Sequence, residues 1–267
     1  MMSPDTTPSS PGKQRRGLYL YGIAEGPLEG PVGLTGVGEP PGEVFAIPYH
    51  DVAAIVSETS DADPAPTRRN VFAHQRVLLA IMEQRTVIPV SFGNVLSSST
   101  HIGEVLKGGY DSFKGTFEFI RGKIEVGLVV SWTEEAFKEE LRSIGKGLAS
   151  IRKARRQTRK RASSSLQTAI STGEAAAEAL SERSSRIRRA IHDKLKPHAA
   201  SSRLCAPLGE RTIINAAYLV DRRQEAAFDQ AVSEIAAEIG DRFEFRYTGP
   251  WPPYNFVDIK LTLASPE

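Results

Sequence analysis

The sequence is short of the residues that build redox, metal and catalytic sites. Its 267 residues include one cysteine, Cys205, so no disulfide can close within the chain, as is usual in a reducing compartment such as the cytoplasm. The five histidines form no HExxH motif and no zinc-type pattern with cysteine. The sequence therefore predicts a protein that is not an enzyme, with no catalytic residue, no metal ligand and no cofactor.

Long apolar runs and phosphate-binding glycine motifs are missing too. No stretch approaches the ~18 apolar residues of a membrane span, and the N-terminus lacks the apolar core of a secretory signal. The Pro-, Ser- and Thr-rich residues 1–16 predict a disordered tail. Residues 26–42 are rich in Gly and Pro but contain neither GxGxxG nor GxxxxGK[ST], which predicts a loop. We expect no membrane contact and no small-molecule substrate.

Two candidates for acid–base chemistry have simpler structural explanations. His74 lies on the apolar stripe of a predicted helix, where a core histidine is the default and a general base the minority alternative. The acidic pairs at 134–135 and 139–140 follow Trp132 at a predicted helix start, where carboxylates complement the helix dipole. Neither pattern is typical of a catalytic site.

Positive charge is concentrated in the middle of the chain. Residues 1–125 carry 11 basic and 14 acidic side chains, residues 126–204 carry 17 and 8, and residues 205–267 carry 6 and 10. Seven cations fall within ten positions, with no acidic residue between Glu140 and Glu174: Arg152, Lys153, Arg155, Arg156, Arg159, Lys160 and Arg161. Like charges at helical spacing destabilise a helix, and an acidic partner offsets that cost.

Three interpretations of this basic run stay open. It forms a solvated or internally paired helix face, it binds a protein, or residues 146–161 bind nucleic acid. The run has no interleaved aromatic residues, and the chain has no RNP, KH or zinc-finger signature, so nucleic acid is the weakest of the three.

Hydrophobic periodicity predicts alternating strands and helices. In the N-terminal half we expect strands at 18–23, 44–47, 52–56 and 86–90, and helices at 71–81, 102–106 and 113–120. In the C-terminal half we expect strands at 124–132, 213–220, 242–247 and 256–261, and a helix at 225–239. The near-continuous apolar run of 124–132 indicates burial on both faces, and residues 133–196 predict long helices broken near Gly145, Gly147 and Gly173.

These elements predict an α+β protein of two domains. We expect an N-terminal α+β domain at 17–121 and a C-terminal domain at 122–267 that is a modified ferredoxin-like unit with a long helical insert at 132–200.

The segment Gly249-Pro250-Trp251-Pro252-Pro253-Tyr254 is the most specific local feature. Three prolines fix φ and remove amide donors, which predicts a rigid turn that presents two aromatic rings. Either the rings cap the sheet, or Trp251 and Tyr254 form a contact surface for another protein.

Residues 248–257 resemble the C-terminal signature of the GvpF/GvpL family of gas vesicle proteins. Further landmarks follow in the family's order: Tyr19–Ile23, His74, Val87–Gly93, Lys123–Val126 and Ala217–Val220. The resemblance spans about residues 17–262, and Ser91 departs from it at a position that is often basic.

The resemblance implies a cytoplasmic accessory or minor structural protein of gas vesicles. It implies as partners the small, very hydrophobic major shell protein and other accessory gas vesicle proteins, and it carries no catalytic residues. On this basis we expect the chain to assist nucleation and assembly of the vesicle, in a chaperone-like way, and to limit aggregation of the shell protein. Candidate protein-binding residues are Trp251, Tyr254, Arg152, Arg155, Arg156, Arg159, Lys160 and Arg161.

Overall fold

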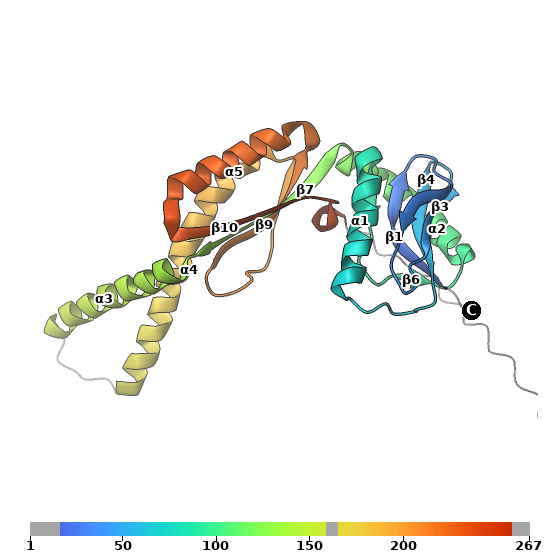
Figure 1. Ribbon diagram of the computed structural model, residues 1–267. Helices are drawn as coiled ribbons and strands as arrows, with labels where there is room; N and C mark the ends of the chain where they lie inside the picture. The colour runs from blue at the N-terminus through green and yellow to red at the C-terminus, as the bar shows by residue number, and fades with distance from the viewer. Residues whose placement is uncertain (1–16, 159–164, 258–267) are drawn as a thin grey trace, which may run out of the picture. The chain divides into compact units, whose positions relative to one another are not determined.

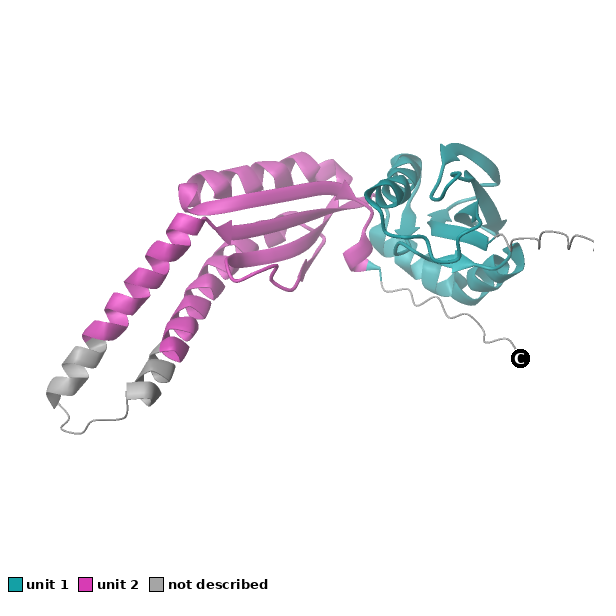
Figure 2. Cartoon of the chain, turned by 60° about the horizontal axis from the view of Figure 1, so that its bottom comes forward, with its two compact units in different colours: residues 1–121, 257–267 teal, residues 122–256 magenta. Residues whose placement is uncertain are grey.

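The computed structural model describes residues 17–158 and 165–257, and of residues 151–158 and 165–172 it describes the backbone only. The chain divides into two compact units (Figures 1 and 2): unit 1 is residues 1–121 with 257–267, and unit 2 is residues 122–256. Each unit has its own β-sheet and helices, so the predicted mixture of helix and sheet is confirmed. The predicted tail 1–16, Arg159, Lys160, Arg161 and residues 258–261 of the last predicted strand lie outside the described residues.

Unit 1 is built on an antiparallel sheet with the strand order β2-β3-β4-β1-β5, in which β6 also pairs with β1. Its strands are β1 (Gly17–Glu25), β2 (Gly30–Thr35), β3 (Glu43–Tyr49), β4 (Val52–Thr59), β5 (Val87–Pro89) and β6 (Val95–Leu96). The prediction of a loop over 26–42 is wrong, because β2 forms there. It is an edge strand with an irregular register between Pro31 and Leu34, and an edge tolerates the missing proline donor.

Two helices complete unit 1: α1 (Arg68–Gln84) and α2 (Ser99–Ile120). Each begins at a hydroxyl cap, since Thr67 accepts from the Asn70 amide and Ser98 from the His101 amide. The prediction of two short helices at 102–106 and 113–120 is wrong, because α2 continues through Gly108 and Gly109. A Cβ on Gly109 would lie 2.3 Å from the ring of Phe113, so this glycine makes room for a buried ring within one continuous helix.

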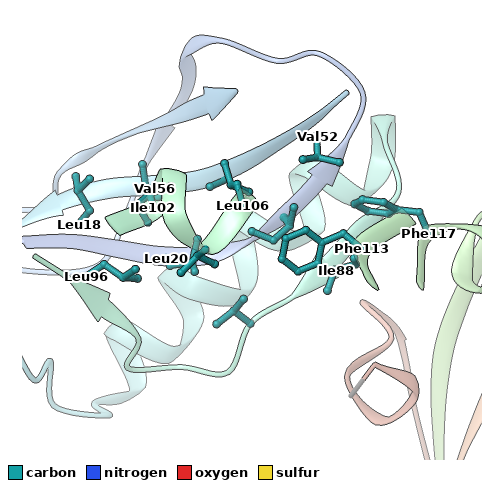
Figure 3. Packing of buried hydrophobic residues seen from close by; sticks show 14 of the residues in the cluster. Leu18, Leu20, Val52, Val56, Ile88, Leu96, Ile102, Leu106, Phe113 and Phe117 are labelled. Carbon is teal, nitrogen blue, oxygen red and sulfur yellow. The ribbon is translucent and has the colours of Figure 1, made fainter. Parts of the chain in front are cut away.

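The two helices cover opposite faces of the unit 1 sheet. Along β1 the register shifts between Leu20 and Gly22, so that Leu18, Leu20 and then Ile23 point to the α2 side. Figure 3 shows that side, where Leu18 and Leu20 pack with Val56 of β4 and with α2 residues. Tyr19 and Tyr21 lie against His74 of α1 on the other side.

Unit 2 is built on an antiparallel sheet in the order β10-β7-β9-β8. Its strands are β7 (Lys123–Trp132), β8 (Ser201–Leu204), β9 (Thr212–Asp221) and β10 (Phe243–Trp251). The sequence did not predict β8, which is a four-residue edge strand without alternating apolar residues. The expectation that β7 is buried on both faces is wrong, because Gly127, Val129 and Ser131 are only partly buried. The helices pack on one face of this sheet, and the other face is open around Gly127, Val129 and Ser131.

Three α-helices lie in the described part of unit 2: α3 (Glu134–Thr158), α4 (Ser165–Leu195) and α5 (Glu225–Ile239). The end of α5 at Gly240, with φ of 69°, confirms the prediction. The predicted breaks at Gly145, Gly147 and Gly173 are wrong, because α3 and α4 run through them. Both helices extend beyond the sheet (Figure 1).

The C-terminal end of unit 2 also differs from the prediction. The strand β10 continues through Gly249 and Pro250 to Trp251, where a turn was expected. Phe256, expected in a last strand, lies in the short 3-10 helix η4 (Tyr254–Phe256). Val257 packs against the hydrophobic core of unit 1.

Candidate functional site

Three of the landmark segments in unit 1 meet in a buried aromatic cluster. The Tyr19 hydroxyl and Nδ1 of His74 form a hydrogen bond of 2.9 Å. The backbone amide of Gly93 donates to the same hydroxyl at 3.1 Å, and the Phe92 ring lies 5.8 Å from both the Tyr19 and His74 rings. The opening strand, α1 and the Phe-Gly segment are therefore fastened together at one tyrosine.

Tyr21 anchors the glycine-rich stretch in a similar way. Its hydroxyl is hydrogen-bonded to Oγ of Ser57 at 2.8 Å and accepts from the Val37 amide at 2.7 Å. A Cβ on Gly36 would lie 1.9 Å from that hydroxyl, so a glycine is required where the chain passes the ring. Burial raises the pKa of Tyr21, and the phenol stays neutral.

His74 is a core residue. Its side chain is buried, and desolvation lowers its pKa to about 4, against a smaller opposite effect from the Val90 backbone. The imidazole is therefore neutral at neutral pH. This environment matches the core interpretation of His74 and not that of a solvent-accessible general base.

In unit 2 the C-terminal signature is fastened to the landmark strand β7 by a buried carboxylate. The Asn255 backbone amide donates to Oε2 of Glu125 at 2.7 Å, and its side-chain amide donates to Oε1 at 2.6 Å. Burial raises the pKa of Glu125, while the two Asn255 bonds act in the opposite direction. Both carboxylate oxygens are used to hold the segment that follows Pro253. Both landmark segments are recognisable in the sequence, but no sequence signal indicates that Glu125 and Asn255 bind each other.

Gly249 lets the chain approach β7 closely. Its φ is 135°, and a Cβ there would lie 3.0 Å from the Glu125 carbonyl oxygen and 3.1 Å from Cγ1 of Val126. The peptide bond before Pro250 is cis. Trp251 then pairs with Glu125 in the sheet after a register shift that begins at Thr248.

The signature segment crosses the open face of the unit 2 sheet. The Arg203 guanidinium on the far edge strand β8 donates to the Asn255 carbonyl oxygen at 2.9 Å. Pro252 and Pro253 are buried, whereas Trp251 and Tyr254 are half-buried. The two candidate aromatic residues lie together in one anchored segment, with part of each side chain exposed.

Three candidate arginines of the basic run lie in the last part of α3. Arg152, Arg155 and Arg156 lie in α3, of which only the backbone is described there. Arg159, Lys160 and Arg161 lie outside the described residues. Four of the seven cations of the run, counting Lys153, thus lie on this helix.

A buried acidic residue joins the base of α3 to its neighbours. Glu140 is 4% exposed and pairs with Arg183 of α4 at 2.8 Å and with Arg242 at 3.3 Å. The Arg242 guanidinium also lies over the Trp132 ring, 5.4 Å from its centroid. Glu134 pairs with exposed Lys138 instead. Of the acidic residues assigned to the helix dipole, Glu140 has a structural role that sequence spacing did not reveal.

A cavity of about 650 Å³ lies at the other end of the same open sheet face. Val129 and Ser131 are on the face of β7 opposite to buried Val130 and Trp132, and their partners Arg246 and Glu244 come from β10. The cavity is lined by Val129, Ser131, Phe137, Leu208, Gly209, Glu210, Arg211, Thr212, Glu244, Phe245 and Arg246. Apolar side chains and charges of both signs share its wall.

No group of three or more His, Cys, Asp or Glu side chains at 17–150 and 173–257 is arranged to hold a metal ion. Among the described helices, none has the length and apolar content to cross a membrane.

The family described as gas vesicle synthesis protein GvpL/GvpF matches residues 17–258, a range that runs through both units. The chain belongs to this family, as the motif resemblance predicts.

Individual relatives match over nearly their whole length. Gas vesicle protein F1 of Halobacterium salinarum is 30% identical over 252 residues, which cover 91% of this chain and 94% of that protein. The crystal structure of GvpF from Anabaena superposes with a TM-score of 0.78 and 28% identity, covering 91% of this chain and 99% of that one. The crystal structure of GvpF from Microcystis aeruginosa gives 0.76 and 26%, with the same coverage.

Proposed function

We propose that this chain is an accessory or minor structural protein of gas vesicles that binds the major shell protein and assists nucleation and assembly of the vesicle. The observation that carries the proposal is the family match over residues 17–258, together with a GvpF crystal structure that covers 91% of this chain at a TM-score of 0.78. A relative that shares both units supports a shared role for the whole molecule.

The proposed mechanism is chaperone-like. A very hydrophobic shell subunit exposes apolar patches and strand edges, and both drive aggregation. A protein that covers such a patch before the shell grows limits off-pathway association. Exposed apolar side chains such as Leu141 and Leu208, beside charged residues, give this chain surface suited to such contacts.

The contact residues that we propose remain the anchored aromatic segment and the basic run. They are Trp251, Tyr254, Arg152, Arg155, Arg156, Arg159, Lys160 and Arg161. The half exposure of Trp251 and Tyr254 supports a contact that adds to their structural role. The relatives named above give no support to the alternative of nucleic-acid binding.

The proposal also covers the biochemical class of the protein, its location in the cell, its further partners and its domains. We propose a protein without catalytic activity or cofactor that acts in the cytoplasm and at the gas vesicle, with other accessory gas vesicle proteins as additional partners. We also propose that residues 17–121 and 122–267 are two domains, the second of them modified ferredoxin-like. The order of its elements, β7-α3-α4-β8-β9-α5-β10, and the sheet order β10-β7-β9-β8 support this assignment.

Co-purification from cells that also produce the shell protein tests the function. We expect the tagged wild type to recover shell protein, and a Trp251→Ala/Tyr254→Ala variant or a variant with Arg155, Arg156, Arg159 and Arg161 changed to Gln to recover several-fold less. The matched aromatic control is Phe72→Ala/Tyr247→Ala, whose side chains are 58% and 36% exposed elsewhere. Absence of shell protein from the wild-type eluate would refute the function, whereas equal recovery by all variants would refute only the contact residues.

A further inference from the structure

The cavity on the open face of unit 2 continues as an apolar stripe along α3. Phe137 lines the cavity, and Leu141, Ile144 and Leu148 follow it at intervals of four, three and four residues, which places all four on one side of the helix. At 1.5 Å per residue the stripe is about 16 Å long. We call the cavity and this stripe together the α3 groove.

The stripe is only partly covered, because Leu141 is exposed while Phe137, Ile144 and Leu148 are half-buried. Ala136 and Glu140 are the buried residues within the described side chains of α3, at 134–150, and Glu140 binds Arg183 of α4, so this side of α3 faces α4. Leu141 lies about 100° further round the helix and is 41% exposed. On the opposite wall of the cavity Leu208 is 62% exposed. The groove therefore exposes apolar side chains on both of its walls.

Charge along α3 changes in one direction. The helix begins with Glu134 and Glu135, but from Leu141 to Thr158 its sequence has no acidic residue. The same stretch has six cationic residues: Arg142, Lys146, Arg152, Lys153, Arg155 and Arg156. Such a block repels itself along the helix, and carboxylates from a partner offset the repulsion.

We propose that the α3 groove binds an amphipathic α-helix of a partner protein, with its apolar face on Leu141, Leu148 and Leu208 and with carboxylates beside the exposed cations Arg142 and Lys146. Apolar residues at helical spacing accept a second helix by ridge-into-groove packing, and the cavity has room for its larger side chains. The basic flank selects an acidic polar face over a basic one. This inference does not require the partner to be the shell protein.

Fluorescence anisotropy with defined peptides tests the groove. The probe is a labelled helical peptide of about 18 residues, some five turns, with Leu on one face and Glu on the other. A second probe carries Lys in place of every Glu. Full-length wild type should bind the Glu peptide about tenfold or more tightly than the Lys peptide, and the difference should shrink as salt is raised.

Substitutions on the two walls give independent readouts. Leu141→Glu on α3 and Leu208→Glu on the loop should each weaken binding of the Glu peptide about tenfold or more. The matched control is Val71→Glu, which introduces the same charge at a residue of unit 1 that is 39% exposed, and it should leave affinity within about twofold. Circular dichroism confirms that each variant is folded. Equal binding of the two peptides, or equal affinity of Leu208→Glu and Val71→Glu for the Glu peptide, would overturn the proposal.

If the peptide results hold while the shell protein fails to co-purify, the groove stands and the proposed function does not. If shell protein co-purifies while the peptide results fail, the function stands and its contact surface lies elsewhere.

Discussion

The two units fasten their landmark segments with different chemistry. In unit 1 the neutral hydroxyl of Tyr19 binds neutral His74 and the Gly93 amide. In unit 2 the buried carboxyl group of Glu125 holds Asn255 by two hydrogen bonds. A neutral network costs little to bury, whereas a buried carboxylate is costly once its donors are removed. In both units these hydrogen bonds hold a following segment against a strand. Because the groups differ, mutation and pH should change the stability of the two units to different extents.

Removal of the Glu125 carboxylate should have the largest effect. In Glu125→Ala two donors of Asn255 lose their acceptor and the signature segment loses its anchor, so we expect the free energy of unfolding to fall by about 3 kcal/mol. Urea denaturation measures it. The control Glu139→Ala removes an exposed carboxylate from α3 and should change stability by less than about 0.5 kcal/mol. Equal losses in the two variants would show that the anchor is dispensable.

The second largest effect should be the pH dependence of stability that His74 causes. The pKa falls from 6.5 to about 4 on folding, so between these values the unfolded chain binds a proton that the folded chain does not. The stabilisation is present above pH 6.5 and is lost as pH falls toward 4. Between pH 7 and 4.5 the stability advantage of the wild type over His74→Phe should shrink by about 2–3 kcal/mol.

The same comparison with Val77→Ala, a buried residue of α1 whose side chain does not titrate, supplies the control for this pH series. Its difference from wild type should stay nearly constant. A constant difference for His74→Phe as well would contradict a neutral, buried imidazole. Glu125 responds in the opposite sense, since a raised carboxyl pKa gives a contribution that is present at low pH and lost as pH rises.

The hydroxyl of Tyr19 should contribute less than the carboxylate of Glu125. Tyr19→Phe keeps the ring but leaves the Gly93 amide and His74 without this partner, for an expected loss of about 1–2 kcal/mol. Tyr247→Phe removes a hydroxyl that binds Asp229 on the surface and should cost less than about 0.5 kcal/mol. Thermal unfolding of both variants measures these losses of stability. A loss for Tyr19→Phe as large as that for Glu125→Ala would contradict the difference proposed between the two units.

Adjacent glycines of α2 should give the smallest effects, with opposite signs. A Cβ on Gly108 meets no atom within 4 Å, so Gly108→Ala should raise stability by about 0.5–1 kcal/mol through helix propensity. Gly109→Ala should lower it, because the added methyl group would overlap the buried Phe113 ring. Differential scanning calorimetry of the pair gives both signs, and a gain for both variants would show that the ring has room to move.

Sequence periodicity predicted the strands and helices that pack one apolar face. β1, β4, α1, β9 and α5 were found for this reason. It failed at β2 and β8, which are edge strands with little apolar alternation, and at α2, where packing of Phe113 outweighs the low helix propensity of two glycines. The local hydrophobic pattern therefore predicts the strands and helices of the core, whereas the edge strands form through tertiary contacts that the pattern does not contain.

For the candidate site, the motifs were visible in the sequence and their contacts were not. Nothing in the spacing of Glu125 and Asn255 indicates that they meet across 130 positions. Likewise, the stripe from Phe137 to Leu148 reads as an ordinary core face until the position of α4 shows that part of it stays exposed. Long-range pairing of polar groups has no periodic signature, and a sequence pattern does not say which half of an apolar face is covered.

The Glu125–Asn255 contact has a consequence for the topology of the chain. It joins β7, the first strand of unit 2, to η4 at the end of the unit, while Val257 packs against the core of unit 1. Unit 2 is thus an insertion with adjacent ends, and the backbone passes between the units twice, at residues 121–122 and 256–257. A single backbone cleavage at 256–257 leaves residues 1–121 covalently joined to unit 2, whereas cleavage at 121–122 leaves unit 2 joined only to residues 257–267 of unit 1. Unit 2 has the end-to-end geometry that favours circular permutation or transfer into a host loop.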